Sequence, residues 1–184
     1  MTKKVLVLLA DGFEEIEAIT SIDVLRRAGL NVQTAGVGKK EITGAHEIKI
    51  IADVLLENTY EIPDAVVLPG GMPGAANLRK SSAVTQLLQR MKNSGKLIGA
   101  ICASPAVVLS PQGILDGKKA VCYPGFESDF SSKVKVSEDR VVKDGLVITS
   151  RGPGTALEFS LELVSQLVDK ETAQKLAQGM LLKV

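Results

Sequence analysis

The sequence LIGAICASP, at residues 97–105, places an apolar strand directly before a turn into a helix. Residues 97–101 are all apolar or glycine, which is typical of a strand buried on both faces of a parallel sheet. Small residues surround Cys102, so the chain can turn tightly and start a helix over 103–109. A strand that feeds straight into a helix is part of a βαβ unit. This stretch therefore predicts an α/β fold.

Strands and helices alternate on both sides of this stretch. The patterns predict strands at 4–9, 31–36, 64–68 and 146–150, and helices at 15–28, 82–91, 155–168 and 171–180. Residues 37–60 differ, because alternating polarity at 46–52 indicates a hairpin or an edge strand. Short strands are expected at 119–123, 133–137 and 141–142. No linker or repeat interrupts residues 1–184, so we expect one domain with a mainly parallel sheet and helices on both faces.

The composition excludes several classes of function. The 22 basic and 21 acidic residues give a net charge of +1, which provides no basic surface for nucleic acid or for an anionic membrane. No apolar run approaches the roughly 18 residues that a membrane span needs. The two cysteines form no disulfide framework, and no cluster of histidine and cysteine has the spacing of metal ligands. We therefore expect a reduced, cytoplasmic protein.

Cys102 is the strongest candidate for a chemical role. A thiol at the start of a helix faces unpaired N–H groups and the positive end of the helix dipole, which lower its pKa from about 8.5 toward about 4–7. The arrangement resembles a nucleophile elbow, although the G-x-S-x-G spacing of hydrolases is absent. The alternative is a buried apolar cysteine, the common fate of a free thiol. For Cys122, in the middle of an expected strand, we favour that alternative.

The turn after the first strand is acidic rather than glycine-rich. The carboxylates of residues 11–17 would repel a phosphate, so the glycine-rich loop at 70–74 is weak support for a nucleotide site. Its backbone N–H groups are instead expected near the site as oxyanion donors. Glu14 and Glu15 fit a helix start, whereas Glu17 is placed to face the sheet edge, where burial would raise its pKa. His46, the only histidine, is expected at the surface.

Five stretches in order along the chain resemble the DJ-1/ThiJ/PfpI superfamily, and specifically its DJ-1/ThiJ branch: ADGFEEIEA (10–18), DVLRRAG (23–29), VVLPGGMPGAANL (66–78), AICASPAVVL (100–109) and TSRGPGTALEF (149–159). The resemblance implies a flavodoxin-like three-layer α/β/α sandwich and a homodimer. It implies that Cys102 is the nucleophile and redox-sensitive residue, with the Glu17 carboxylic acid hydrogen-bonded to it. Gly70, Gly71 and Ala103 would supply N–H groups beside the sulfur, and Arg27 of the partner subunit would reach the site mouth.

Three positions depart from the patterns of this superfamily. Protease-like PfpI members have a histidine directly after the cysteine, where this chain has Ala103. Tyr123 stands where DJ-1 relatives often have a histidine near the site. His46 matches an arginine that lines the mouth in similar proteins, which places His46 nearer to the site than its local sequence does. These differences argue against peptidase activity and against a Cys–His dyad.

The resemblance implies two main functions. The first is a cofactor-independent glyoxalase III or deglycase that acts on small carbonyls such as methylglyoxal through Cys102. The second is a redox sensor or chaperone in which Cys102 oxidises without turnover. Amidase or peptidase activity and thiazole-phosphate biosynthesis rank lower. No cofactor, metal, nucleic acid or membrane is expected.

Overall fold

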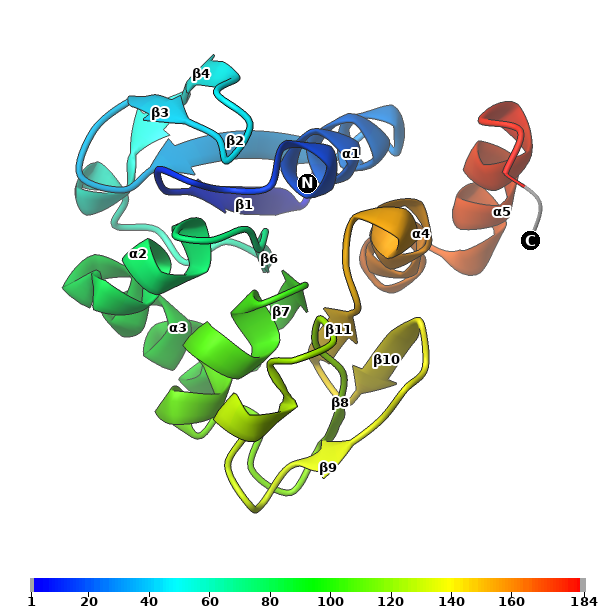
Figure 1. Cartoon of the computed structure of the whole chain (residues 1–184). Helices are drawn as coiled ribbons and strands as arrows, with labels where there is room; N and C mark the ends of the chain where they lie inside the picture. The colour runs from blue at the N-terminus through cyan, green and yellow to red at the C-terminus, as the bar shows by residue number, and fades with distance from the viewer. Residues whose placement is uncertain (1, 183–184) are drawn as a thin grey trace.

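The computed structural model describes residues 2–182 and contains a seven-stranded central sheet (Figure 1). The strands lie in the order β10-β11-β7-β6-β1-β2-β5. All are parallel except β10, which pairs antiparallel with β11 at the edge. Their bounds are β1 (Lys4–Leu9), β2 (Asn31–Gly36), β5 (Val54–Leu55), β6 (Ala65–Leu68), β7 (Leu97–Ile101), β10 (Val141–Asp144) and β11 (Val147–Ser150).

Helices cover both faces of this sheet. One face carries α1 (Glu15–Arg27) and α4 (Ala156–Leu167), with α5 (Lys170–Gly179) packed on α4. The other face carries α2 (Gly74–Lys80) and α3 (Ser82–Asn93), as Figure 1 shows. This arrangement confirms the predicted flavodoxin-like three-layer sandwich. No helix among residues 2–182 is long and apolar enough to cross a membrane.

The central strands are buried because helices pack closely on them. All five residues of β7 are buried, including Gly99. A Cβ atom at Gly99 would lie 3.0 Å from atoms of both Leu163 and Phe159 in α4. The glycine within this strand therefore allows the close approach of α4 rather than a bend of the strand.

The segments outside the central sheet are shorter than the sequence predicts. The hairpin in residues 37–60 is confirmed as β3 (Glu41–Thr43) and β4 (Lys49–Ile51), but β8 (Lys119–Ala120) and β9 (Lys135–Val136) are only two residues long. Beyond β8, the Val121 N–H donates to the side-chain hydroxyl of Thr149 in β11, 3.0 Å away, rather than to the backbone of a neighbouring strand. Single 3₁₀ turns span Leu56–Asn58, Ser110–Gln112, Glu127–Asp129 and Pro153–Thr155.

The helix expected over 103–109 is a π-helical turn, Pro105–Leu109. The Ser110 N–H donates to the Pro105 carbonyl, five residues earlier, which is the hydrogen bond of a π turn. All five residues of the turn are buried. Short π turns of this kind are frequent at functional sites.

Candidate functional site

Cys102 sits in a strained turn at the carboxyl end of β7. Its φ of 65° lies in the left-handed region, which costs a residue other than glycine roughly 1–3 kcal/mol. Two backbone hydrogen bonds hold this conformation. The Cys102 N–H donates to the Ser150 carbonyl at 2.9 Å, and the Tyr123 N–H donates to the Cys102 carbonyl at 2.8 Å. The scaffold therefore imposes the geometry of an elbow.

The loop after β6 presses against this elbow. A Cβ atom at Gly70 would lie 2.5 Å from the Cys102 Cβ, closer than side-chain atoms can approach. The buried Ser104 hydroxyl donates to the Pro69 carbonyl at 2.6 Å and ties the two loops together. Ser104 and Ser150 are positioning residues that the sequence analysis missed, because a small serine in a turn has no distinctive pattern.

Glu17 is fully buried beside the cysteine. Its Oε2 accepts a hydrogen bond of 2.7 Å from the Gly70 N–H, while Oε1 is buried and meets no N–H or O–H group among residues 2–182. The Cys102 thiol interacts with the same carboxyl. Burial raises the pKa of Glu17 to about 7, and the bonds from Gly70 and Cys102 oppose that rise. A carboxyl with this pKa exchanges protons near neutral pH.

The thiol of Cys102 is also affected by burial, since the residue is only 8% exposed. Burial raises the pKa of Cys102 to about 12, the negative charge of Glu17 adds to the rise, and hydrogen bonds from the Gly71 and Ala103 N–H groups oppose it. The sequence predicts a lowered pKa for the Cys102 thiol. That prediction is wrong when Glu17 is ionised, because the pKa of the thiol is then raised. The expectation relied on a helix dipole, whereas desolvation of the thiol and the nearby Glu17 charge outweigh the N–H groups at the helix start.

The two groups behave as one titrating pair. Their site accommodates one negative charge, because ionising either group raises the pKa of the other. When Glu17 is protonated, its repulsion of a thiolate disappears and its O–H can donate to the sulfur. The Gly71 and Ala103 N–H groups remain as donors to that sulfur. Transfer of the thiol proton to the Glu17 carboxylate therefore gives a thiolate that faces a neutral acid and two N–H donors.

Of the three backbone groups expected at the sulfur, the structure places two there. The N–H groups of Gly71 and Ala103 bond to Cys102. The N–H of Gly70 points instead to Glu17. Gly70 therefore orients the acid rather than binding the sulfur, and this role follows from a tertiary contact that sequence spacing does not reveal.

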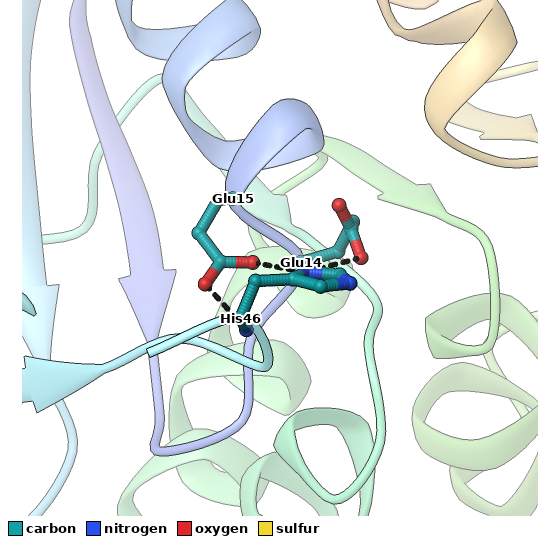
Figure 2. Close-up of side chains that lie close together, drawn as sticks. All are labelled: Glu14, Glu15 and His46. Carbon is teal, nitrogen blue, oxygen red and sulfur yellow. Dashed lines mark hydrogen bonds and ion pairs between the residues drawn. The ribbon is translucent and has the colours of Figure 1, made fainter. Parts of the chain in front are cut away.

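His46 lies in the loop between β3 and β4 and reaches the start of α1 (Figure 2). Its Nδ1 is 2.8 Å from Glu15 Oε2 and 3.8 Å from Glu14 Oε2. Its backbone N–H donates to Glu15 Oε1 at 2.7 Å. The Glu14 N–H in turn donates to the Gly70 carbonyl at 3.0 Å, so this cluster adjoins the Glu17 pocket. Glu15 does more than favour a helix start, since it holds the loop.

Tyr123 has a backbone role at the elbow, whereas the role implied for Arg27 of the partner subunit stays a prediction. Tyr123 supports the elbow through its backbone N–H, and its half-exposed ring packs where a side chain on Gly152 would sit. Arg27, on the exposed side of α1, donates from Nε to Asp23 of its own helix at 2.6 Å. Within a single chain, Arg27 is thus not brought to Cys102.

Cys122 has different surroundings from Cys102. It is 2% exposed, and burial raises its pKa to about 12. The charged groups that act on it are Glu127, Arg151 and Asp129, none of which acts on Cys102. Among residues 2–182, no backbone N–H lowers its pKa as the N–H groups of Gly71 and Ala103 do for Cys102. This is the setting of a structural cysteine, as expected.

The sequence model of the DJ-1/PfpI family matches residues 3–166. The chain belongs to the DJ-1/PfpI family. It is 41% identical over 184 residues to Protein DJ-1 homolog B of Arabidopsis thaliana, covering 99% of this chain and 42% of that protein. It is 37% identical over 182 residues to the glutathione-independent glyoxalase DJR-1.2 of Caenorhabditis elegans, covering 98% and 97% of the two chains.

A solved DJ-1 superfamily structure has the same fold. It is that of a cysteine-to-alanine mutant of the protein STM1931 from Salmonella typhimurium, with a TM-score of 0.95, 36% identity and complete coverage of both chains. The chain spans less than half the length of the Arabidopsis relatives that it matches. The DJ-1 fold and the family are thereby established for this chain.

Proposed function

We propose that this DJ-1 family protein converts small reactive carbonyls, such as methylglyoxal, without a cofactor. The observation that carries the proposal is the contact between the elbow thiol of Cys102 and the buried Glu17, whose pKa is raised to about 7. The similarity to a relative named as a glutathione-independent glyoxalase supports it. A deglycase reaction would begin at the same carbonyl chemistry. A cytoplasmic setting, where thiols stay reduced, is part of the proposal.

The first step is addition of the thiolate to the aldehyde. The Glu17 carboxylate takes the thiol proton as the Cys102 sulfur forms a bond to the aldehyde carbon. The carbonyl electron pair becomes an alkoxide, which takes that proton from Glu17. The product is a hemithioacetal. The N–H groups of Gly71 and Ala103, which bond to the sulfur, stabilise its negative charge before attack.

The second step moves a hydrogen between the two carbons of the substrate. Glu17 as carboxylate removes the proton from the former aldehyde carbon and returns one to the neighbouring carbon, which gives a lactoyl thioester. Water then cleaves the carbon–sulfur bond, releases lactate and restores the thiol. The steps are redox-neutral overall, so no external oxidant or reductant enters. A carboxyl with a pKa near 7 suits both proton transfers.

Lactate formation from methylglyoxal by the purified protein tests the proposal. We expect the Cys102→Ala variant to be inactive, and the Glu17→Gln variant to lose about two orders of magnitude or more in turnover. Cys122→Ala is the matched control, because it removes the other buried thiol, and we expect it to retain turnover. Lactate formation by Cys102→Ala, or wild-type turnover in Glu17→Gln, would contradict the mechanism.

A redox-sensing or chaperone function is the second candidate. The observation that favours it is the pair of N–H groups at the Cys102 sulfur, which with protonated Glu17 would hold a sulfinate. This function requires oxidation but no turnover. A protein that forms no lactate yet oxidises selectively at Cys102 would support this candidate over the first.

We also propose that the chain forms a homodimer. Four isoleucines are exposed on α1 and in or beside β4: Ile16, Ile19, Ile48 and Ile51. We infer that a second copy of the chain covers these side chains, because exposed apolar patches mark protein interfaces. A symmetric dimer through α1 would bring Arg27 of the partner subunit toward the mouth of the site. Light scattering after size exclusion tests the assembly, and a monomer at micromolar concentration would overturn it.

A further inference from the structure

The start of α1 and the β3–β4 loop bring three metal-ligating side chains together outside the Cys102–Glu17 pair. One ligand atom from each of Glu14, Glu15 and His46 lies within 4.8 Å of the others. In Figure 2 the carboxylates of Glu14 and Glu15 approach the His46 ring from opposite sides, and both interact with its Nδ1. We propose that these three residues bind a divalent transition-metal ion such as Zn²⁺. The proposal is independent of the carbonyl chemistry.

The spacing of the ligand atoms suits a tetrahedral ion. Zinc bonds of about 2.0–2.1 Å place neighbouring tetrahedral ligand atoms about 3.4 Å apart. In the structure His46 Nδ1 lies 2.8 Å from Glu15 Oε2 and 3.8 Å from Glu14 Oε2. These distances bracket the tetrahedral value, so small side-chain rotations accommodate an ion. Three protein ligands leave the fourth position to water or to a bound molecule.

The Glu14 carboxylate supplies the second observation. Its side chain is only 12% exposed, yet no N–H or O–H group among residues 2–182 donates a hydrogen bond to it. The basic side chain next to it is the His46 imidazole, whose Nδ1 lies 3.8 Å from Glu14 Oε2. A carboxylate that is largely covered and that no protein donor holds is available as a ligand to an ion.

Charge in the neighbourhood also favours a cation. Glu14 lies near enough to Glu17 to raise its pKa further, so three carboxylates from the first turn of α1 surround this region. Among residues 2–182, the basic side chain that contacts Glu14 and Glu15 is the His46 imidazole. The Glu15 side chain is 6% exposed and already oriented by the backbone N–H groups of His46 and Ile48, so its Oε2 is held in place before any ion arrives.

The chemical types of the three ligands indicate which ion would bind. Two carboxylates and one imidazole suit Zn²⁺, and Co²⁺ as its spectroscopic substitute, better than Mg²⁺, which prefers oxygen ligands and retains its water. The Cys102 thiol is a competing ligand for zinc, and the experiment must separate the two. Co²⁺ does so, because a thiolate ligand gives an intense charge-transfer band that carboxylate and imidazole ligands do not.

Calorimetric titration of the reduced 184-residue chain with ZnCl₂ at fixed pH tests the proposal, with MgCl₂ as comparison. We expect one Zn²⁺ per chain, and a loss of affinity of at least about tenfold in both His46→Gln and Glu14→Gln. Glu47→Gln, which changes the exposed glutamate next to His46, is the matched control and should bind as the wild type does. Glu15 is left intact because it also holds the loop.

Three outcomes would overturn the proposal. The first is no zinc binding by the wild type. The second is binding that survives in His46→Gln and Glu14→Gln, which would leave Glu15–His46 as a loop contact only. The third is loss of binding in Cys102→Ser together with a thiolate band in the Co²⁺ spectrum, which would place the ion at the cysteine. Binding of Co²⁺ by Cys102→Ser without such a band would support the proposed ligands.

Discussion

Replacing Glu17 by glutamine should change how the stability of the fold depends on pH. Glu17 has a folded-state pKa of about 7 against an ordinary value of 4.5, because burial disfavours its charge. Between these two values the folded state holds a proton that the unfolded state has released. The stability contributed by the protonated carboxyl is therefore present at low pH and is lost as the pH rises toward 7 and above.

The magnitude follows from the same two values. Between pH 5 and pH 8, linkage predicts that Glu17 alone lowers the free energy of unfolding by about 2.5 kcal/mol. Glu17→Gln cannot ionise and should not show this loss. At each pH, the free energy of unfolding of the variant is subtracted from that of the wild type. The change in this difference between pH 5 and pH 8 gives the contribution of Glu17, because the two proteins share all other titrating groups. Thiol ionisation adds little, since it lies above pH 8 in both states.

Urea unfolding of both proteins at pH 5 and pH 8 measures this difference. Glu171→Gln, at an exposed glutamate of α5, serves as control and should follow the wild type at both pH values. A double difference below about 0.5 kcal/mol, or one of opposite sign, would show that Glu17 ionises normally in the folded protein. It would then not be the buried proton store that the mechanism requires.

Three further predictions concern the elbow. Iodoacetamide at neutral pH should label Cys102 before Cys122, because Cys102 is more exposed and has N–H donors at its sulfur; peptide mass spectrometry decides, and preferential labelling of Cys122 would contradict the assignment. Mild peroxide should add two oxygens to Cys102 without a Cys102–Cys122 disulfide, which intact mass would reveal. Gly70→Ala should lower the free energy of unfolding by about 1–3 kcal/mol, whereas Gly154→Ala, with open space around it, should cost far less; equal urea midpoints would refute the close contact.

The central fold was predictable because its signals are local. The apolar residues of 97–101 and the small residues around Cys102 specify a buried strand and a tight turn without reference to the rest of the chain. The same holds for β1 and β6. The shortening of β8 was not predictable, because it depends on a residue far along the chain. The hydroxyl of Thr149, in β11, accepts the hydrogen bond from the Val121 N–H, which is then not available to extend β8.

The site was predictable in its members and in part of its electrostatics. Motifs at 10–18 and 100–109 identified Glu17 and Cys102, and the rise of the Glu17 pKa through burial was predicted as well. The rise of the Cys102 pKa was not, because segments far apart in the chain bury the thiol beside Glu17. The partnership of His46 with Glu15 spans 31 residues and was missed for the same reason. A sequence pattern names side chains that can react, but their protonation depends on what covers them.

Both backbone groups of Cys102 are hydrogen-bonded: its N–H donates to the Ser150 carbonyl, and its carbonyl accepts from the Tyr123 N–H. Neither hydrogen bond involves the sulfur, and neither depends on which side chain occupies position 102. The sulfur is therefore not needed for the hydrogen bonds that hold this turn. A change of this one side chain would silence the chemistry while leaving the surrounding surface, including the Glu14–His46 cluster, available for binding. The proposed chemistry at Cys102 and the proposed ion binding at Glu14, Glu15 and His46 can therefore be lost independently of each other.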